Sequence, residues 1–212
     1  MRTKPYATAI ALFHELDLLD VAGPISVLSS AGRQWNFQPF KLDLVANRAG
    51  PIRTRNALAL EATHGAATHS GCECLIIPGG YGARHAAKDP EFAGWLARAA
   101  ASAQWVAAIG NGVWLLAQCG LLGGEEFAAS PDLAAEIREL CPEARLNSRG
   151  GLCVSGKFLS AQKSALGLDL SCEIVARCFG PKLASSLSAT LGIDWAGELG
   201  ALEIVPAPLR AK

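Results

Sequence analysis

Residues 105–122 read WVAAIGNGVWLLAQCGLL, and this stretch decides the fold. It is an apolar run that reaches a glycine-asparagine-glycine break and then resumes as a second apolar run. Such a pattern is typical of a buried strand, a tight turn and a buried helix. We therefore predict a strand at 105–109, a turn at 110–112 and a helix at 113–122.

The surrounding segment, 99–124, requires a test for membrane insertion. It contains no charged residue and is long enough to span a bilayer. Three polar residues, Gln104, Asn111 and Gln118, and the glycine break in the middle argue against a transmembrane helix. We therefore expect a buried core segment and no membrane partner.

Strands and helices alternate outward from this stretch. Apolar or alternating runs predict further strands, at 6–13, 40–46, 74–77 and 152–154. Helical spacing predicts helices at 20–30, 133–140, 160–178 and 182–191, and one that Asp89 caps and Pro90 begins, with Phe92, Trp95 and Leu96 on its inner face. Gly50 and Pro51 mark a turn into a small hairpin. The repeated order predicts an α/β sandwich of three layers, with helices on both faces of a mostly parallel sheet.

Length and composition narrow the class of protein. A chain of 212 residues commonly forms one domain, so we expect a single domain over 1–212. Charged residues make up 18%, below the roughly 25% of an average globular domain, which favours a packed three-layer fold and a homodimer. Nineteen basic and 19 acidic residues give zero net charge, and no basic stretch resembles a phosphate-binding surface. Nucleic acid is therefore not an expected partner.

Cysteine usage and the N-terminus bear on the compartment. The seven cysteines are scattered, and the first residues lack the apolar core and cleavage site of a signal peptide. A reducing cytoplasm fits these features best. Cys72 and Cys74 have no second pair at zinc-ligand spacing, so we expect no metal, and nothing in the sequence indicates another cofactor.

Several short motifs, in this order, resemble one known family. They read LDVAGP at 19–24, IIPGG at 76–80, VAAIGNG at 106–112, LLA at 115–117, GLL at 120–122 and LSAQ at 159–162. Together they resemble the ThiJ/PfpI superfamily, which is class I glutamine amidotransferase-like, over roughly 6–191. The nearest branches are isonitrile hydratase and the amidase-like domains of AraC-type regulators. The resemblance implies a flavodoxin-like fold.

The resemblance also implies a reactive cysteine that this chain lacks. In the family, a cysteine sits on a strained turn between strand and helix, where the helix N-terminus lowers its pKa. Here that position is Gly110. The hydratase branch carries a histidine ten residues beyond the GLL motif, and Ser130 stands at the matching place. Because nucleophile and base act as a unit, losing both indicates that the family's covalent chemistry has gone. Glycine tolerates the strained angles of such a turn, so the turn itself can persist.

The remaining candidate ligand residues lie where loops leave the carboxyl ends of parallel strands. Asp20 could hold a cationic or hydrogen-bond-donating ligand or activate a water, and it could also be a helix N-cap. Asn111 could point its amide into the pocket or serve the turn alone. The N–H groups of Gly79 and Gly80 could hold an oxyanion, although a tight turn needs the same glycines. The predicted site that would bind a small-molecule or anionic ligand comprises Asp20, Gly79, Gly80, Tyr81, Gly110, Asn111, Gly112 and Ser130.

Other reactive side chains are weaker candidates. We interpret the cysteines on predicted helices and strands as core residues, namely Cys119, Cys153, Cys172 and Cys178. The histidines do not cluster in the sequence and are interpreted as surface or loop residues, namely His14, His64, His69 and His85. Residues 78–82, PGGYG, form a glycine-rich loop, here called the glycine loop. Arg84 and His85 follow it closely enough to line the rim of a pocket, or they lie in a solvated loop.

Three functions are compatible with these residues. The first is a non-catalytic binding or scaffold protein. The second is a hydratase or lyase, isonitrile hydratase-like or of another kind, in which Asp20 is the water-activating base. The third is a stand-alone sensor domain related to AraC-type regulators. A complete regulator is not expected, because the sequence ends at Lys212, shortly after the last predicted helix, without room for a helix-turn-helix pair.

Overall fold

The computed structural model describes residues 4–33, 37–147 and 151–195, and a seven-stranded sheet forms its centre. In spatial order the strands are β10 (Leu152–Ser155), β11 (Phe158–Ala161), β7 (Trp105–Ile109), β6 (Cys74–Ile77), β1 (Tyr6–Ala11), β2 (Phe40–Ala46) and β5 (His64–Gly65). All neighbouring strands pair in parallel except β10 and β11, which are antiparallel. The predicted, mostly parallel sheet is confirmed.

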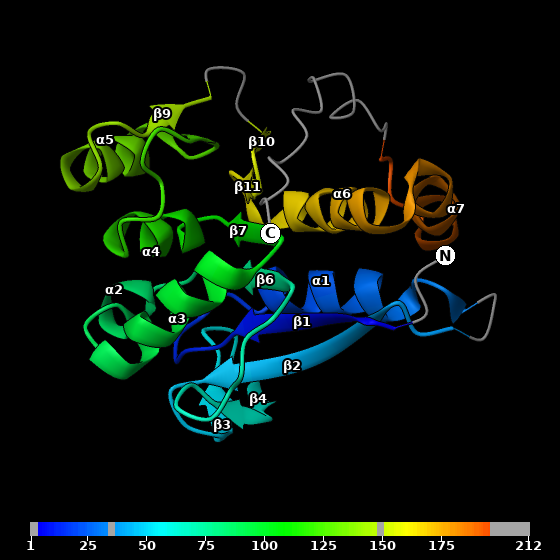
Figure 1. Ribbon diagram of the computed structural model, residues 1–212, viewed down its shortest axis with the longest axis horizontal. Coiled ribbons are helices and arrows are strands. Elements are labelled where there is room, and N and C mark those ends of the chain that lie inside the picture. Colours follow the sequence, from blue (N-terminus) through cyan, green and yellow to red (C-terminus); the bar gives the residue numbers. More distant parts are fainter. Residues whose placement is uncertain (1–3, 34–36, 148–150, 196–212) are drawn as a thin grey trace, which may run out of the picture.

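Helices cover both faces of the sheet (Figure 1). They are α1 (Leu19–Ser30), α2 (Ala83–Ala86), α3 (Pro90–Ser102), α4 (Gly112–Gln118), α5 (Pro131–Leu140), α6 (Gly167–Phe179) and α7 (Pro181–Leu191). α1, α6 and α7 pack against one another, whereas α2 packs against α4, and α4 against β6, β7 and α5. The structure therefore has the predicted three layers of a flavodoxin-like α/β fold.

The glycine-asparagine-glycine stretch folds as its sequence pattern predicts. β7 is almost wholly buried, and α4 follows it after a turn of two residues. α4 ends at Gln118, four residues earlier than predicted, because Gly120 adopts a left-handed φ of 70° shortly beyond. None of the helices within the described residues is long and apolar enough to cross a membrane.

α3 begins as its sequence predicts. Asp89 Oδ1 accepts hydrogen bonds from the N–H groups of Glu91, at 3.0 Å, and Phe92, at 3.2 Å. Pro90 occupies the first turn, where its missing N–H costs nothing. The inner face of α3 is buried as predicted, with Trp95 only 1% exposed.

The predicted helix at 160–178 is wrong at its start. Residues 158–161 form β11, which pairs with β7 on one side and β10 on the other. A 3-10 turn, Ser164–Leu166, precedes α6. Periodicity cannot distinguish a short buried strand from the first turn of a buried helix, which explains the error.

Two small strand pairs complete the fold. β3 (Gly50–Arg53) and β4 (Ala59–Ala62) form the predicted antiparallel hairpin. β8 (Glu126–Phe127) and β9 (Arg145–Leu146) form a separate parallel pair. The sequence did not predict this pair, since two residues per strand are too few for alternation to register.

Candidate functional site

Gly110 occupies a left-handed turn between β7 and α4. Its φ is 56°, and its N–H donates to the carbonyl of Ala161 at 2.8 Å. A Cβ atom at this position would lie 3.6 Å from Asp20 Oδ2, and apart from the flanking residues no other heavy atom of the described chain lies within 4 Å of it. The space therefore admits a side chain directed at Asp20, and only the backbone conformation favours glycine.

Asp20 lies in the first turn of α1 and is only 1% exposed. Its Oδ2 accepts the N–H of Gly79 at 2.8 Å. The helix is not capped by this side chain, because α1 already begins at Leu19, so the N-cap interpretation is wrong. Burial raises the pKa of Asp20, and the Ser164 side chain and the Gly79 N–H partly oppose that shift. Asp20 Oδ1 is buried and has no hydrogen-bond partner among the described residues.

Asn111 links two loops through its side chain. One is the turn at 110–111 between β7 and α4, here called the elbow, and the other is the glycine loop. Its Oδ1 accepts the N–H of Gly80 at 2.6 Å, and its Nδ2 donates to the carbonyl of Gly80 at 2.9 Å. The Asn111 amide thus pairs with backbone instead of standing free for a ligand. Because Asp20 already takes the N–H of Gly79, both amides expected to hold an oxyanion are hydrogen-bonded within the chain.

Close packing explains why the loop requires glycine at residue 79. A Cβ on Gly79 would lie 2.7 Å from Asn111 Oδ1 and 2.9 Å from both Asp20 Oδ2 and the Ile109 carbonyl. These separations are well below ordinary carbon–oxygen contact. The structure therefore brings Asp20, Gly79, Gly80, Gly110 and Asn111 together as one hydrogen-bonded cluster, here called the elbow cluster.

The other predicted site residues have different surroundings. Gly112 begins α4, and a Cβ there would collide with the carbonyl of Ile77. Tyr81 is 78% exposed on the glycine loop. Ser130 is exposed and is the N-cap of α5, where its Oγ accepts the N–H of Leu133 at 3.4 Å. The hydroxyl at the expected histidine position is therefore used by a helix end.

Burial raises the thiol pKa values of five of the seven cysteines. All seven are free thiols. Burial raises the pKa of Cys72 to about 11 and those of Cys153 and Cys172 to about 12, and it also raises the pKa values of Cys74 and Cys119. A thiol with a raised pKa is a poor nucleophile near neutral pH, because the thiolate is the reactive form.

His69 lies in a loop, which is one of the two expected settings, but its side chain is buried. Its side chain is 4% exposed, and its Nε2 lies 3.5 Å from Asp43 Oδ2. Its Nδ1 accepts from Trp95 Nε1 at 3.2 Å. Burial lowers the pKa of His69 and Asp43 opposes the shift. Among the described residues, no group of three or more histidines, cysteines or carboxylates could hold a metal ion.

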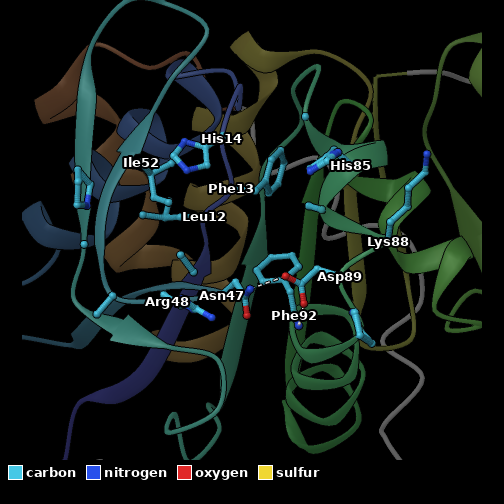
Figure 2. Close-up of a pocket in the computed structure, with 17 residues that line it drawn as sticks. Leu12, Phe13, His14, Asn47, Arg48, Ile52, His85, Lys88, Asp89 and Phe92 are labelled. Carbon is cyan, nitrogen blue, oxygen red and sulfur yellow. Dashed lines mark hydrogen bonds between the residues drawn. The ribbon is translucent and has the colours of Figure 1, made fainter.

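A cavity of about 610 Å³ lies beside the elbow cluster and does not include it. It is lined by residues from 12–14, 46–52 and 82–92, so it opens between the β2–β3 connection and the α2–α3 segment (Figure 2). His85 lines it, as the sequence suggested. Arg84 does not; its guanidinium lies 5.3 Å from the ring centroid of Trp114 and pairs with Glu136.

Sequence reasoning missed the rest of this cavity. A signal was present, because the polar turn that begins at Asn47 follows β2 at the carboxyl end of the sheet. Loops at that end of a parallel sheet commonly line ligand sites. The pairing of 46–52 with 82–92 across the cavity, however, depends on tertiary packing.

The fold and the elbow define a class: an α/β protein built around a strand-to-helix elbow. Residues 7–177 match the model of the DJ-1/PfpI family. The chain belongs to the DJ-1/PfpI family, as the sequence motifs predicted.

The chain is also related to AraC-type regulators. It is 20% identical over 184 residues to the HTH-type transcriptional regulator GbdR of Pseudomonas aeruginosa, covering 87% of this chain and 50% of GbdR. It thus spans about half the length of that relative.

Solved structures share the fold. A ThiJ/PfpI family protein from Pseudomonas syringae has a TM-score of 0.78 at 21% identity, with 98% of this chain and 79% of that chain covered. An AraC family transcriptional regulator from Pseudomonas putida has a TM-score of 0.77 at 23% identity, with 88% of this chain and 100% of that chain covered.

Proposed function

We propose that this protein is a non-catalytic member of the DJ-1/PfpI family that binds a small molecule or acts as a scaffold. One observation carries the proposal: Gly110 occupies the elbow position at which the family resemblance places the reactive cysteine. Two further features support it. The Gly79 and Gly80 amides are paired with Asp20 and Asn111. Ser130, at the expected histidine position, caps α5.

The chemistry of the elbow cluster favours one kind of ligand. The N–H groups of Gly79, Gly80 and Gly110 are occupied, which disfavours an anion at these donors. The unpaired group of the cluster is an acceptor, Asp20 Oδ1. A buried acceptor without a partner is costly, so a ligand that donates a hydrogen bond to it would be stabilised. At the elbow we therefore favour a ligand that carries a hydroxyl, amine or amide N–H.

A substrate screen tests the non-catalytic proposal. The purified protein is assayed with isonitriles, glyoxals and amides, beside a cysteine-bearing member of the family as the active control. We expect product formation no faster than in buffer, because no thiolate is present at the elbow. Turnover at rates like those of the control would contradict the proposal.

A second candidate is a hydratase or lyase in which Asp20 activates water. The burial of Asp20, its raised pKa and its unpaired Oδ1 favour this alternative, because a general base needs such properties near neutral pH. Asp20→Asn decides it. The variant keeps an oxygen that can accept the Gly79 N–H but cannot take up a proton. If an activity found in the screen is unchanged in this variant, Asp20 is not the base.

A third candidate is a sensor domain, which the relationship to AraC-type regulators favours. In that role the chain would bind a ligand without itself contacting DNA. A gel-shift titration tests this separation of tasks, and we expect no DNA binding by residues 1–212. A shifted band at low protein concentration would contradict it.

Assembly and location complete the proposal. We infer one domain over 1–212, active as a cytoplasmic homodimer. All seven cysteines are free, which fits a reducing compartment. Three large apolar side chains, Leu19, Leu58 and Tyr81, are 46%, 56% and 78% exposed, and such surface is commonly covered by a partner.

A further inference from the structure

The cavity beside the elbow cluster has an apolar floor. Its buried lining residues are Leu12, Phe13, Ala46, Ile52, Ala86 and Phe92. The volume of about 610 Å³ falls within the range typical of small-molecule sites, roughly 300–1,000 Å³. This floor suits an aromatic or aliphatic ligand body, because burial of apolar surface stabilises the bound state.

The rim of the cavity carries a net positive charge, with two basic side chains and one carboxylate among the described residues that form it. Arg48 and Lys88 are exposed lining residues. His14 and His85 lie on opposite sides of the cavity (Figure 2). Asp89 is the one carboxylate among the described lining residues, and both of its oxygens are occupied. Its Oδ1 accepts two N–H groups of α3, and its Oδ2 accepts from Asn47 Nδ2.

Asn47 adds a specific polar contact. Its Nδ2 donates to Asp89, which fixes the orientation of the amide (Figure 2). Its Oδ1 is then buried, and no described residue donates to it. Asn47 thus holds Asp89 in place at the cavity wall through its Nδ2, while its Oδ1 lies buried behind that wall.

The cavity is separate from the elbow cluster. Neither Asp20, Gly110 nor Asn111 lines it. The glycine loop lies between the two, because Gly79 and Gly80 bond to the elbow side chains whereas Gly82 lines the cavity. Occupation of one site can therefore be measured independently of the other.

We propose that this cavity is a second ligand site, which takes a small organic anion with an apolar body. A carboxylate or sulfonate lies near Arg48 and Lys88, and the body packs on Phe13, Ile52 and Phe92. The inference goes beyond the proposed function, since it assigns a site and a ligand charge that differ from those of the elbow.

Calorimetric titration with 2-naphthylacetate tests the charge requirement. The neutral 2-naphthylacetamide has the same body without the anion, so we expect it to bind more weakly. Arg48→Gln and Lys88→Gln should each weaken the acid about 2- to 5-fold, the range expected of an exposed ion pair, and leave the amide unaffected. Arg98→Gln is the matched control, because Arg98 is exposed on α3 but does not line the cavity.

Amide chemical shifts locate the bound probe. We expect perturbations at 46–52 and 82–92, and their loss in Ala49→Trp, which fills the mouth of the cavity from an exposed loop position. Perturbations centred on 110–112 would instead place the ligand at the elbow and overturn the inference. It also fails if the acid does not bind saturably, or if Arg48→Gln and Lys88→Gln behave like Arg98→Gln. None of these outcomes bears on the turnover screen, so the two proposals fail separately.

Discussion

At the scale of single residues, Gly110 combines an open position with a demanding backbone angle. A Cβ atom on Gly110 would point into open space, and the nearest atom beyond the flanking residues would be Asp20 Oδ2 at 3.6 Å. Steric crowding therefore does not explain the glycine. Its φ of 56° is adopted by glycine without the penalty of about 1–2 kcal/mol that other residues incur. Glycine at this position therefore keeps the turn without that strain.

Asp20 gives the fold a specific pH dependence. Burial raises its pKa above the ordinary 3.8, so the folded state retains this proton to higher pH than the unfolded chain does. Ionising the buried group then costs stability, and the cost grows as the pH rises from 3.8 through the folded-state pKa. Asp20→Asn removes the ionisation. In urea unfolding at several pH values, we expect the variant to gain stability relative to the native protein across that window.

A flat difference between the two proteins from pH 4 to pH 8 would contradict this account of Asp20.

Residue identities in the elbow cluster were predictable, but their pairings were not. The sequence motifs located Asp20, Gly79, Gly80, Gly110 and Asn111. Which of them form hydrogen bonds with one another depends on contacts between residues that lie 31 to 59 positions apart in the sequence. The burial of His69 was missed for the same reason, because it follows from Asp43 and Trp95, which lie on other elements.

At the scale of elements, two helix ends differ in how well they are capped. Asp89 satisfies two N–H groups of α3 and also bonds Asn47, whereas Ser130 makes one contact of 3.4 Å at α5. Asp89→Ala should therefore lower the free energy of unfolding by about 1–2 kcal/mol, and Ser130→Ala by less than about 1 kcal/mol. Urea denaturation measures both, and equal losses would contradict this ranking.

Elements with strong local signals were predicted well, and those without were not. Asp89 and Pro90 marked the start of α3 because capping chemistry is local. β11 was mistaken for helix because its place in the sheet depends on pairing with two other strands. β7 is remote from it in the sequence, and β10 is too short for its pairing with β11 to be predicted. The β3–β4 hairpin was predicted from Gly50 and Pro51, which were expected to form a turn leading into it and which begin β3 itself.

At the scale of the whole molecule, exposed apolar residues bear on assembly. Leu19 begins α1, whereas Leu58 and Tyr81 lie on loops. The segments around them are joined by a bridge between Leu16 and Gly80 and by a 3.0 Å hydrogen bond from the Leu18 N–H to Asn56 Oδ1. We expect light scattering to give a mass twice 22.1 kDa.

Substitution of exposed apolar residues tests the homodimer, and an exposed leucine on another element provides the control. Leu58→Ser and Tyr81→Ser should shift the protein toward monomer, because each removes an exposed apolar side chain from the proposed dimer contact. Leu140→Ser is the control, since Leu140 is 42% exposed on α5. A native protein that stays monomeric at high concentration would contradict the homodimer.

The central claim is that no sulfur nucleophile serves the elbow, and the rate of cysteine alkylation tests it most directly. Iodoacetamide is added at pH 7.5, and each modified cysteine is located by peptide mass spectrometry. Gly110→Cys, which places a thiol at the elbow, shows whether the reagent can reach it. We predict that all seven native thiols react more slowly than free cysteine, because the fold buries them or leaves them away from Gly110. A native cysteine that reacts faster than free cysteine, and whose modification abolishes a measured turnover, would contradict the claim.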